Sequence, residues 1–258
     1  MLFERTIYLG IDPASGRRKS ALVALDSSMK PVRLERGSLS SILASAAGMN
    51  EAAAGVTTPQ CANKGLMQRR HIRYLRGLNP EGSQFSKYRV CEYELQTRKL
   101  RLKPAPASVE DPTGAVRNGY RLYQGLREMG YTAFDMDNRS DGQVYLEVPE
   151  RAVFAAMLKV RPYRANTLEG RMQRQLALYM AGLDLANPLM VLEEITRHKL
   201  LTGALDLEQL LEPALLAALA AAYTAYLAGE QPEKVTQVGD PEDGLITLPV
   251  EELLTEYR

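Results

Sequence analysis

Short apolar stretches separated by turn residues open the chain. Residues 7–12 and 21–25 each have the apolar pattern of a β-strand, and the small residues 13–16 between them predict a hairpin turn. Residues 31–36 alternate apolar and basic side chains, which is typical of a third strand with one exposed face. We therefore expect the chain to begin with a three-stranded antiparallel unit.

A helix and a strand are predicted next. Residues 39–47 have helical spacing and end at Gly48, and residues 52–58 form a small-residue strand that Pro59 stops. A helical crossover would make this fourth strand parallel to the first one. Helices are also predicted over 91–99, 112–129, 149–158, 189–200 and 207–227, and strands over 132–136, 143–148 and 245–248.

One further helix is predicted to have two different faces. Asn166 and Glu169 form a capping pair at its start. Arg171 and Arg174 lie on one side of it and are candidates for contacting a nucleic-acid backbone. Its predicted apolar side consists of Leu168, Met172, Leu176 and Met180.

The formal net charge of +1 hides a strong asymmetry along the chain. Residues 61–103 contain 11 Lys or Arg against 3 Asp or Glu, whereas residues 201–258 contain 2 against 11. The basic segment belongs to a long, weakly periodic stretch over about 60–106 that we interpret as an insertion over the functional site. A basic surface of this size suits a nucleic-acid groove, and the alternative is a solvated surface balanced by the acidic end.

Cysteine usage and hydropathy indicate a cytoplasmic protein that does not cross a membrane. Cys61 and Cys91 are too few for a disulfide framework, and neither has the spacing of a zinc site. The longest apolar stretch, residues 213–229, is shorter than a bilayer span. The two histidines, His71 and His198, are isolated and lack metal-ligand neighbours.

Asp12 is the first candidate for chemistry. It stands at the end of the first predicted strand, where a rigid backbone can hold a carboxylate against a magnesium ion. The alternative is that Asp12 only starts the following turn, a role for which Asp is well suited.

The arginines of the basic insertion are the second candidate. Arg69, Arg70 and Arg73 are spaced so that they could share a helical face, and Tyr74 adds an aromatic ring of the kind used for base stacking. This combination predicts a phosphate-binding patch. A solvated helix face is the competing interpretation.

Several short motifs follow one another along nearly the whole chain. They are Gly10-Ile11-Asp12, Val56-Thr57-Thr58-Pro59, Cys91-Glu92-Tyr93-Glu94-Leu95, Leu146-Glu147-Val148-Pro149-Glu150, Thr167-Leu168-Glu169-Gly170-Arg171, Ala222-Tyr223-Thr224-Ala225 and the end of the chain from Gly239 to Pro249. In their order and spacing these motifs resemble a family of predicted RNase H-like nucleases known as domain of unknown function 429.

The resemblance implies one α/β domain over residues 1–258, with an RNase H-like mixed sheet, flanking helices and the basic insertion. It also implies a Mg²⁺ or Mn²⁺ site, with Asp12 and Glu147 as catalytic residues and metal ligands whose side chains meet at the sheet edge. Two other positions that are usually acidic in the family are Thr57 and Ala217 here.

Three classes of function follow. The first is a magnesium-dependent nuclease that hydrolyses phosphodiester bonds, with nucleic acid as its partner. The second is a member of the same fold that binds nucleic acid or protein without cutting, which the replacements at Thr57 and Ala217 favour. The third is nucleotide phosphoryl transfer as in actin-like ATPases, but we find no second phosphate-binding hairpin in the sequence. The oligomeric state is left open.

Overall fold

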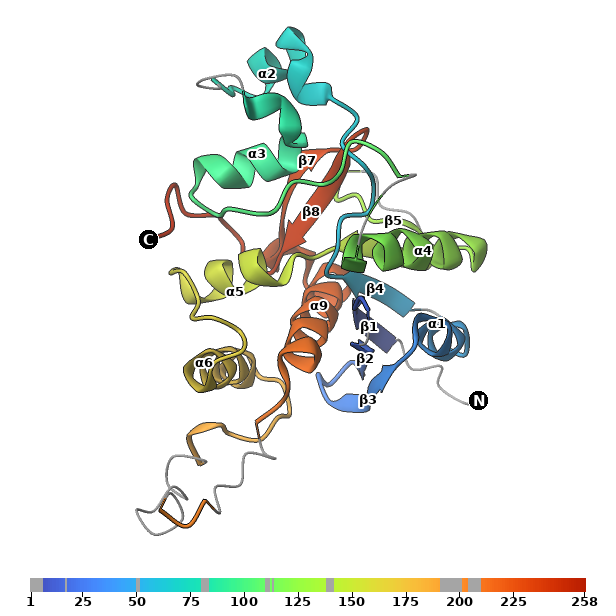
Figure 1. Cartoon of the computed structure of the whole chain (residues 1–258), viewed down its shortest axis with the longest axis vertical. Helices are drawn as coiled ribbons and strands as arrows, with labels where there is room; N and C mark the ends of the chain where they lie inside the picture. Colours follow the sequence, from blue (N-terminus) through green and yellow to red (C-terminus); the bar gives the residue numbers. More distant parts are fainter. Residues whose placement is uncertain are drawn as a thin grey trace.

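The computed structural model of the protein describes residues 7–16, 18–49, 52–79, 84–109, 112, 114–137, 142–190, 201–203 and 210–258 (Figure 1). It is an α/β structure built on a mixed sheet of eight strands. The strands are β1 (Ile7–Asp12), β2 (Ser20–Leu25), β3 (Pro31–Gly37), β4 (Ala52–Val56), β5 (Thr132–Ala133), β6 (Val144–Glu147), β7 (Thr236–Asp240) and β8 (Gly244–Leu248). The α-helices are α1 (Leu39–Ala47), α2 (Arg70–Leu75), α3 (Val90–Thr97), α4 (Gly114–Glu128), α5 (Glu150–Leu158), α6 (Leu168–Met180) and α9 (Pro213–Glu230).

The strand order is β3-β2-β1-β4-β6-β8-β7, and β5 pairs with β6 beside this path. Strands β1, β2 and β3 form the predicted antiparallel unit. After helix α1, which has the predicted bounds, β4 lies parallel to β1 as expected, and β6 continues the parallel pairing. Strand β7 was missed by the sequence analysis, and it pairs antiparallel with β8 at the far edge.

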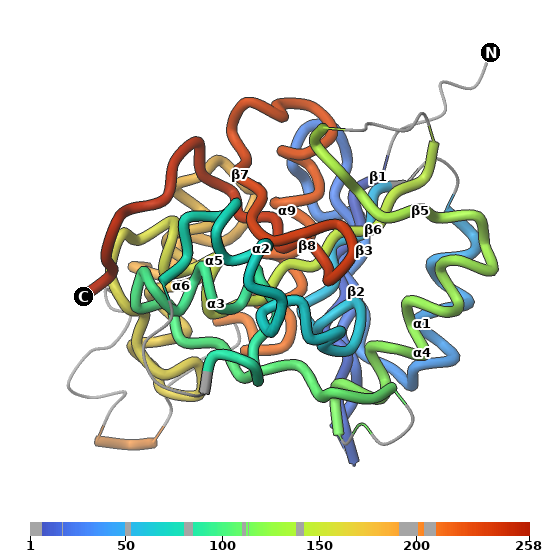
Figure 2. Tube along the Cα trace, turned by 90° about the horizontal axis from the view of Figure 1, so that it is seen from above, coloured from blue at the N-terminus to red at the C-terminus, as the bar shows by residue number. Residues whose placement is uncertain are grey.

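Helices cover both faces of the sheet. Figure 2 shows α1 and α4 side by side on one face, with α9, α5 and α6 on the other. The core on the α1 and α4 face contains Leu9, Ile11 and Val56. The larger core on the α9 face contains Val23, Val148 and most of the alanines of α9. Side chains on successive strand residues alternate between these two cores, as the pleat requires.

The approach of α9 to the sheet is unusually close. A Cβ atom built on Gly10 of β1 would lie 1.8 Å from the carbonyl oxygen of Ala218, and one on Gly55 of β4 would lie 2.3 Å from that of Ala221. Glycine on the strands and alanine on the helix therefore allow the two backbones to touch. This contact fixes how α9 crosses the sheet, and so where its first turn lies.

The basic insertion lies mainly over the late strands. Its arginine-rich helix α2 is at one end of the molecule near β7, while α3 packs against β7 and β8 (Figure 1). It has a small core of its own around Leu66, Met67 and Val90. The chain following α3 returns toward the centre of the sheet at residues 102–104, and these residues reach the cavity described below together with Arg89 and Glu92.

The prediction for α6 was wrong about its buried face. The N-cap is Thr167, one residue after the proposed Asn166, and its side chain accepts a hydrogen bond from the Gly170 amide. It buries Arg174 and Gln175, whereas Met180 is 77% exposed. Polar partners that the periodicity cannot reveal determine this orientation. Most of the helix expected at 189–200 lies outside the described residues, since 191–200 are not described. The helix expected at 207–227 corresponds to α9, and the start of the expected range, 207–209, is likewise not described.

In the described part of the chain, no helix combines the length and apolar character needed to cross a membrane.

Substituting Gly10 by Ala tests the contact between α9 and the sheet. The added methyl group has no space, since the nearest atoms belong to the backbone of α9. We expect the free energy of unfolding to fall by about 3 kcal/mol or more, measured by urea denaturation. Gly48→Ala is the control, because its backbone angles suit alanine and no atom other than its chain neighbours approaches closer than 3.7 Å. Equal effects of the two substitutions would contradict the close approach.

Candidate functional site

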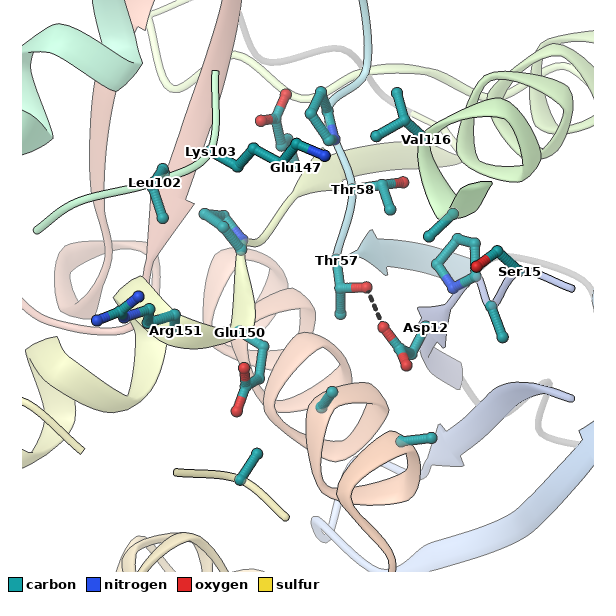
Figure 3. A pocket seen from close by; sticks show the side chains of 18 of the residues that line it. Asp12, Ser15, Thr57, Thr58, Leu102, Lys103, Val116, Glu147, Glu150 and Arg151 are labelled. Carbon is teal, nitrogen blue, oxygen red and sulfur yellow. Dashed lines mark hydrogen bonds between the residues drawn. The ribbon is translucent and has the colours of Figure 1, made fainter. Parts of the chain in front are cut away.

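A cavity of about 460 Å³ opens where β1, β4 and β6 end and where α4, α5 and α9 begin. Asp12 contributes the end of β1, and Thr57 and Thr58 follow β4. Residues 102–104 of the insertion form another part of the wall (Figure 3). Ligands of open α/β sheets bind outside the carboxyl ends of parallel strands, which is the position of this cavity.

Asp12 is held by the hairpin and by its neighbour on the next strand. Its backbone pairs with Ala21 of β2, and the Thr57 hydroxyl donates a hydrogen bond of 2.5 Å to Asp12 Oδ1 (Figure 3). The turn that follows is fixed at Ala14, whose amide donates to Ser20 Oγ at 3.0 Å and whose carbonyl accepts from the side chain of Asn118 on α4. The turn interpretation thus accounts for the backbone but leaves the Asp12 carboxylate directed at the cavity.

Burial raises the pKa of Asp12 to about 6, against the hydrogen bond from Thr57, which lowers it. The Glu150 carboxylate raises this pKa further, and the Arg36 guanidinium lowers it. Arg36 is itself ion-paired with Glu212. Asp12 is thus a carboxylate whose ionisation opposes folding, a property that is common at functional sites.

Glu147 lines the same cavity but lies on the opposite face of the sheet from Asp12. The prediction that the two carboxylates meet at the sheet edge is therefore wrong. Val56 is in register with both Ile11 and Glu147, which places Glu147 level with Ile11 and one residue before Asp12. Side chains one residue apart along a strand point to opposite faces. In Figure 3 the carboxylate of Glu147 points away from Asp12.

The Glu147 carboxylate is engaged by a buried arginine. Arg89 donates to Glu147 Oε1 at 2.5 Å and to Oε2 at 2.8 Å. The backbone N–H of Gln60 also donates to Oε2, at 2.8 Å. Arg89 contacts Glu92 as well, with an Nε to Oε1 distance of 3.0 Å. All three ionic side chains are at most 2% exposed. Both oxygens of Glu147 therefore serve the fold, because removing one partner of such a network leaves a buried charge.

Glu150 is the carboxylate on the Asp12 side. It is the first residue of α5, where a negative charge favours the helix N-terminus. Figure 3 places it below the strand ends together with Asp12. One of its oxygens accepts a hydrogen bond of 2.5 Å from Arg174 Nε. Its negative charge is one of the causes that raise the pKa of Asp12.

The donor set fits one magnesium ion better than two. No group of three His, Cys, Asp or Glu side chains among the described residues is arranged to hold a metal. A two-metal site needs several carboxylates, and with Glu147 paired to Arg89 only Asp12 and Glu150 remain in the cavity outside that network. Magnesium bound in nucleotide and phosphate sites commonly takes one or two carboxylates, with water and substrate phosphate oxygens as its other ligands.

Two of the three arginines predicted to bind nucleic acid in the insertion, Arg69 and Arg73, have partners within the protein. Arg69 forms a bidentate ion pair with Glu242, in which Nη1 lies 3.1 Å from Oε2 and Nη2 lies 3.0 Å from Oε1. Arg73 donates to the carbonyl of Met67 at 2.5 Å and stacks over Phe85. Arg70 is exposed. The acidic end of the chain therefore neutralises part of this surface, as the alternative interpretation proposed.

Arg171 and Arg174 of α6 are also used internally. Arg171 donates to the carbonyls of Leu210 and Leu211 and so ties α6 to the segment before α9. Arg174 is 3% exposed, pairs with Glu150 and lies over the ring of Phe154. These contacts make a direct grip on a nucleic-acid backbone by Arg174 a wrong prediction, and they give Arg171 a structural role.

The cations that do surround the cavity were missed by the sequence analysis. Arg18, Lys19, Lys103 and Arg151 line it and are exposed, and no ion pair joins them to other described residues. Lys103 ends the basic segment over residues 61–103, whereas Arg18, Lys19 and Arg151 lie outside it. For these three, the signal available in the sequence was their position a few residues after the predicted strands that end at residues 12 and 148.

Two helix N-termini add to this positive potential. The first residues of α5 and α9 line the cavity, and neither helix has a side-chain hydrogen bond capping its first turn. Amide N–H groups of a helix's first turn have no partner within the helix, so they favour an anion nearby. The cavity therefore combines Asp12, which has no ion-pair partner among the described residues, with surroundings suited to a phosphate group.

Comparison of the chain with protein-family models, with curated proteins and with solved structures finds no match in any of the three.

Replacing Asp12 by Asn should stabilise the protein in a pH-dependent way. The folded-state pKa of about 6 lies above the ordinary value of 3.8, so the folded state binds the proton more tightly. Stability is then lost as pH rises from about 4 to about 6 and stays low above that. We expect Asp12→Asn to raise the free energy of unfolding by on the order of 2 kcal/mol at pH 8 and to leave it almost unchanged at pH 4. Thermal denaturation at both pH values measures the difference. A gain that is equal at both would contradict the assignment.

Replacing Glu147 by Gln should destabilise the fold by about 3 kcal/mol in urea denaturation, because Arg89 would lose its ionised partner in a buried site. The control is Arg69→Ala, which removes an arginine from an equally well-aligned but exposed pair with Glu242 and should cost less than about 1 kcal/mol. Similar small effects of both substitutions would show that the buried network does not support the fold.

Proposed function

We propose that this protein is a metal-dependent phosphodiesterase of RNase H-like type that hydrolyses nucleic acid. The observation that carries the proposal is Asp12, a carboxylate with a raised pKa at the end of β1 that faces a cavity rimmed by exposed cations. A carboxylate in this position serves as a ligand for a divalent cation, and the rim suits the phosphate that the cation would bind.

The topology supports the RNase H-like assignment. The order β3-β2-β1-β4-β6 has an antiparallel first half and a parallel second half, joined by a helical crossover at α1. Strands β8 and β7 extend it. The four positions at which the resembled family usually has acids line one cavity, although they come from four separate parts of the chain: Asp12, Thr57, Glu147 and Ala217.

In this proposal Asp12 is the protein's principal ligand to Mg²⁺ or Mn²⁺, which would supply a water molecule of lowered pKa for attack on the phosphorus atom. Thr57 holds one oxygen of Asp12 and leaves the other free for the ion. Arg18, Lys19, Lys103 and Arg151 offset the charge that accumulates on the phosphate oxygens. Glu150 is the second acid on this side and is positioned by Arg174.

A non-catalytic nucleic-acid-binding protein is the alternative function. It is favoured by Thr57 and Ala217, which supply no negative charge where the family usually has acids, and by the commitment of Glu147 to Arg89. The same rim of cations would then bind the phosphate without a metal ion. The two functions differ in whether Asp12 is needed for turnover.

Cleavage of a fluorescently labelled single-stranded oligonucleotide with Mg²⁺ or Mn²⁺ tests the proposal. We expect Asp12→Asn to lower the rate about 100-fold or more, because loss of the main ligand removes several kcal/mol of transition-state stabilisation. Ala217→Asp adds a carboxylate to the cavity wall and should lower the Mg²⁺ concentration needed for half-maximal rate about tenfold.

The double variant Asp12→Asn with Ala217→Asp is the control, and it should stay as inactive as Asp12→Asn alone. If neither the wild-type protein nor Ala217→Asp cleaves DNA or RNA with either metal, the catalytic proposal is wrong. Binding without cleavage would then support the alternative.

A further inference from the structure

A second cavity, of about 680 Å³, lies along helix α4 on the other side of the strand-end segment. It is lined by Gln60 and Cys61 and, from the helix, by Arg117, Arg121, Gln124 and Arg127. We call it the α4 groove. None of the described residues that line it is acidic, and the acid of α4, Glu128, accepts a hydrogen bond from the side chain of Gln124.

The α4 groove and the Asp12 cavity share the same two chain segments. Residues 57–59 line the Asp12 cavity and residues 60–61 line the groove, while on α4 residues 115–116 face the first and Arg117 faces the second. The two segments are in close contact, because a Cβ atom on Gly119 would lie 2.1 Å from Thr58 Oγ1. The groove and the Asp12 cavity therefore lie on the two sides of this one contact, and an extended ligand that crosses the contact reaches both.

Arg117 and Arg121 of the groove differ from Arg69 and Arg73 of the insertion because their guanidinium groups are largely free to bind a ligand. Arg121 is exposed, and no hydrogen bond or ion pair joins it to another residue that the structure describes. Arg117 donates from Nε to the Pro112 carbonyl, and its two terminal guanidinium nitrogens make no hydrogen bond to another described residue. Arg127 lies over the ring of Tyr145 at 5.5 Å, and its Nε donates to the hydroxyl of the same residue at 3.1 Å.

The spacing of these arginines suits a chain of phosphates. Arg117 and Arg121 are four residues apart and lie on one face of α4. From Arg117 to Arg127 the helix rises roughly 15 Å. A row of cations of this length, without acids between them, attracts a polyanion with a regular charge spacing. A flexible single strand can follow the groove and bend across the contact between α4 and residues 57–61 to place one phosphate beside Asp12, which a rigid duplex cannot do as readily.

We infer that the α4 groove binds the phosphodiester backbone of single-stranded nucleic acid and guides it to the Asp12 cavity. The inference rests on the proposed function in so far as it takes nucleic acid as the substrate of that site. The insertion arginines, which the sequence had suggested for this role, are replaced in it by Arg117 and Arg121.

Fluorescence anisotropy with a labelled single-stranded 12-mer, in EDTA so that no cleavage occurs, tests the inference. We expect the Arg117→Ala, Arg121→Ala double variant to bind about tenfold more weakly at 0.1 M salt, and the slope of log affinity against log salt to become shallower by about 1.4, for two lost phosphate contacts. Arg70→Ala is the matched control, since Arg70 is also an exposed arginine on a helix but lies in the insertion. It should bind within about twofold of wild type.

Unchanged affinity and slope in the double variant, or an equal loss in Arg70→Ala, would overturn the inference, as would tighter binding of a duplex of the same sequence. Unfolding midpoints of all variants are compared to exclude loss of fold, and Arg117→Lys with Arg121→Lys should retain most of the binding if charge is what matters. Binding through the groove with no cleavage under any metal condition would contradict the nuclease proposal alone. Cleavage that is insensitive to the double variant would contradict the groove alone.

Discussion

The contact between the alanine-rich helix α9 and the glycines of β1 and β4 is the constraint on which the rest of the structure depends. Gly10 and Gly55 allow the backbone of α9 to rest on the centre of the sheet. Asp12 follows Gly10 by two residues on the same strand face, so its carboxylate emerges beside the first turns of α9. The cavity exists because the helix lies this close to the sheet and begins just beyond the strand ends. A larger side chain at either glycine would move the helix and separate the groups that line the site.

Charge pairing then decides which acids are available for chemistry. Glu147 has a position suggestive of a metal ligand, yet Arg89 and the Gln60 amide use both of its oxygens. Arg89 also satisfies Glu92, which in turn accepts from the Ala105 amide, so the network joins the insertion to the sheet. Because ions are costly to bury without such partners, this cluster is stable only when complete. Asp12, by contrast, accepts a hydrogen bond from the hydroxyl of Thr57, and no cation among the described residues forms a hydrogen bond with it.

Much of the framework could be predicted from the sequence because it rests on local patterns. The strands β1, β2 and β3, helix α1 and the parallel strand β4 follow from alternation, helical spacing and turn residues. The site could be predicted only in part. The partner of Glu147 lies 58 residues away in the chain, and nothing local in either segment indicates that pair. For the same reason, the buried face of α6 was misassigned, since Arg174 is buried by its contacts to Glu150 and Phe154 and not by an apolar pattern.

The distribution of paired and unpaired arginines relates the fold to the proposed function. A basic run such as residues 69–76 suggests a polyanion site, but the acidic end of the chain folds back onto it and pairs Arg69 with Glu242 and Arg76 with Asp240. The arginines of α4 face a groove without acids among its described lining residues, although they are less conspicuous in the sequence. Electrostatic attraction to a ligand depends on charge left uncompensated in the folded protein, and not on the number of basic residues in a segment. The region around Asp12 and α4 retains uncompensated positive charge. It lies beside Asp12, whose pKa is raised by burial. A bound divalent cation would stabilise the ionised carboxylate, and a bound phosphate would neutralise the surrounding positive charge.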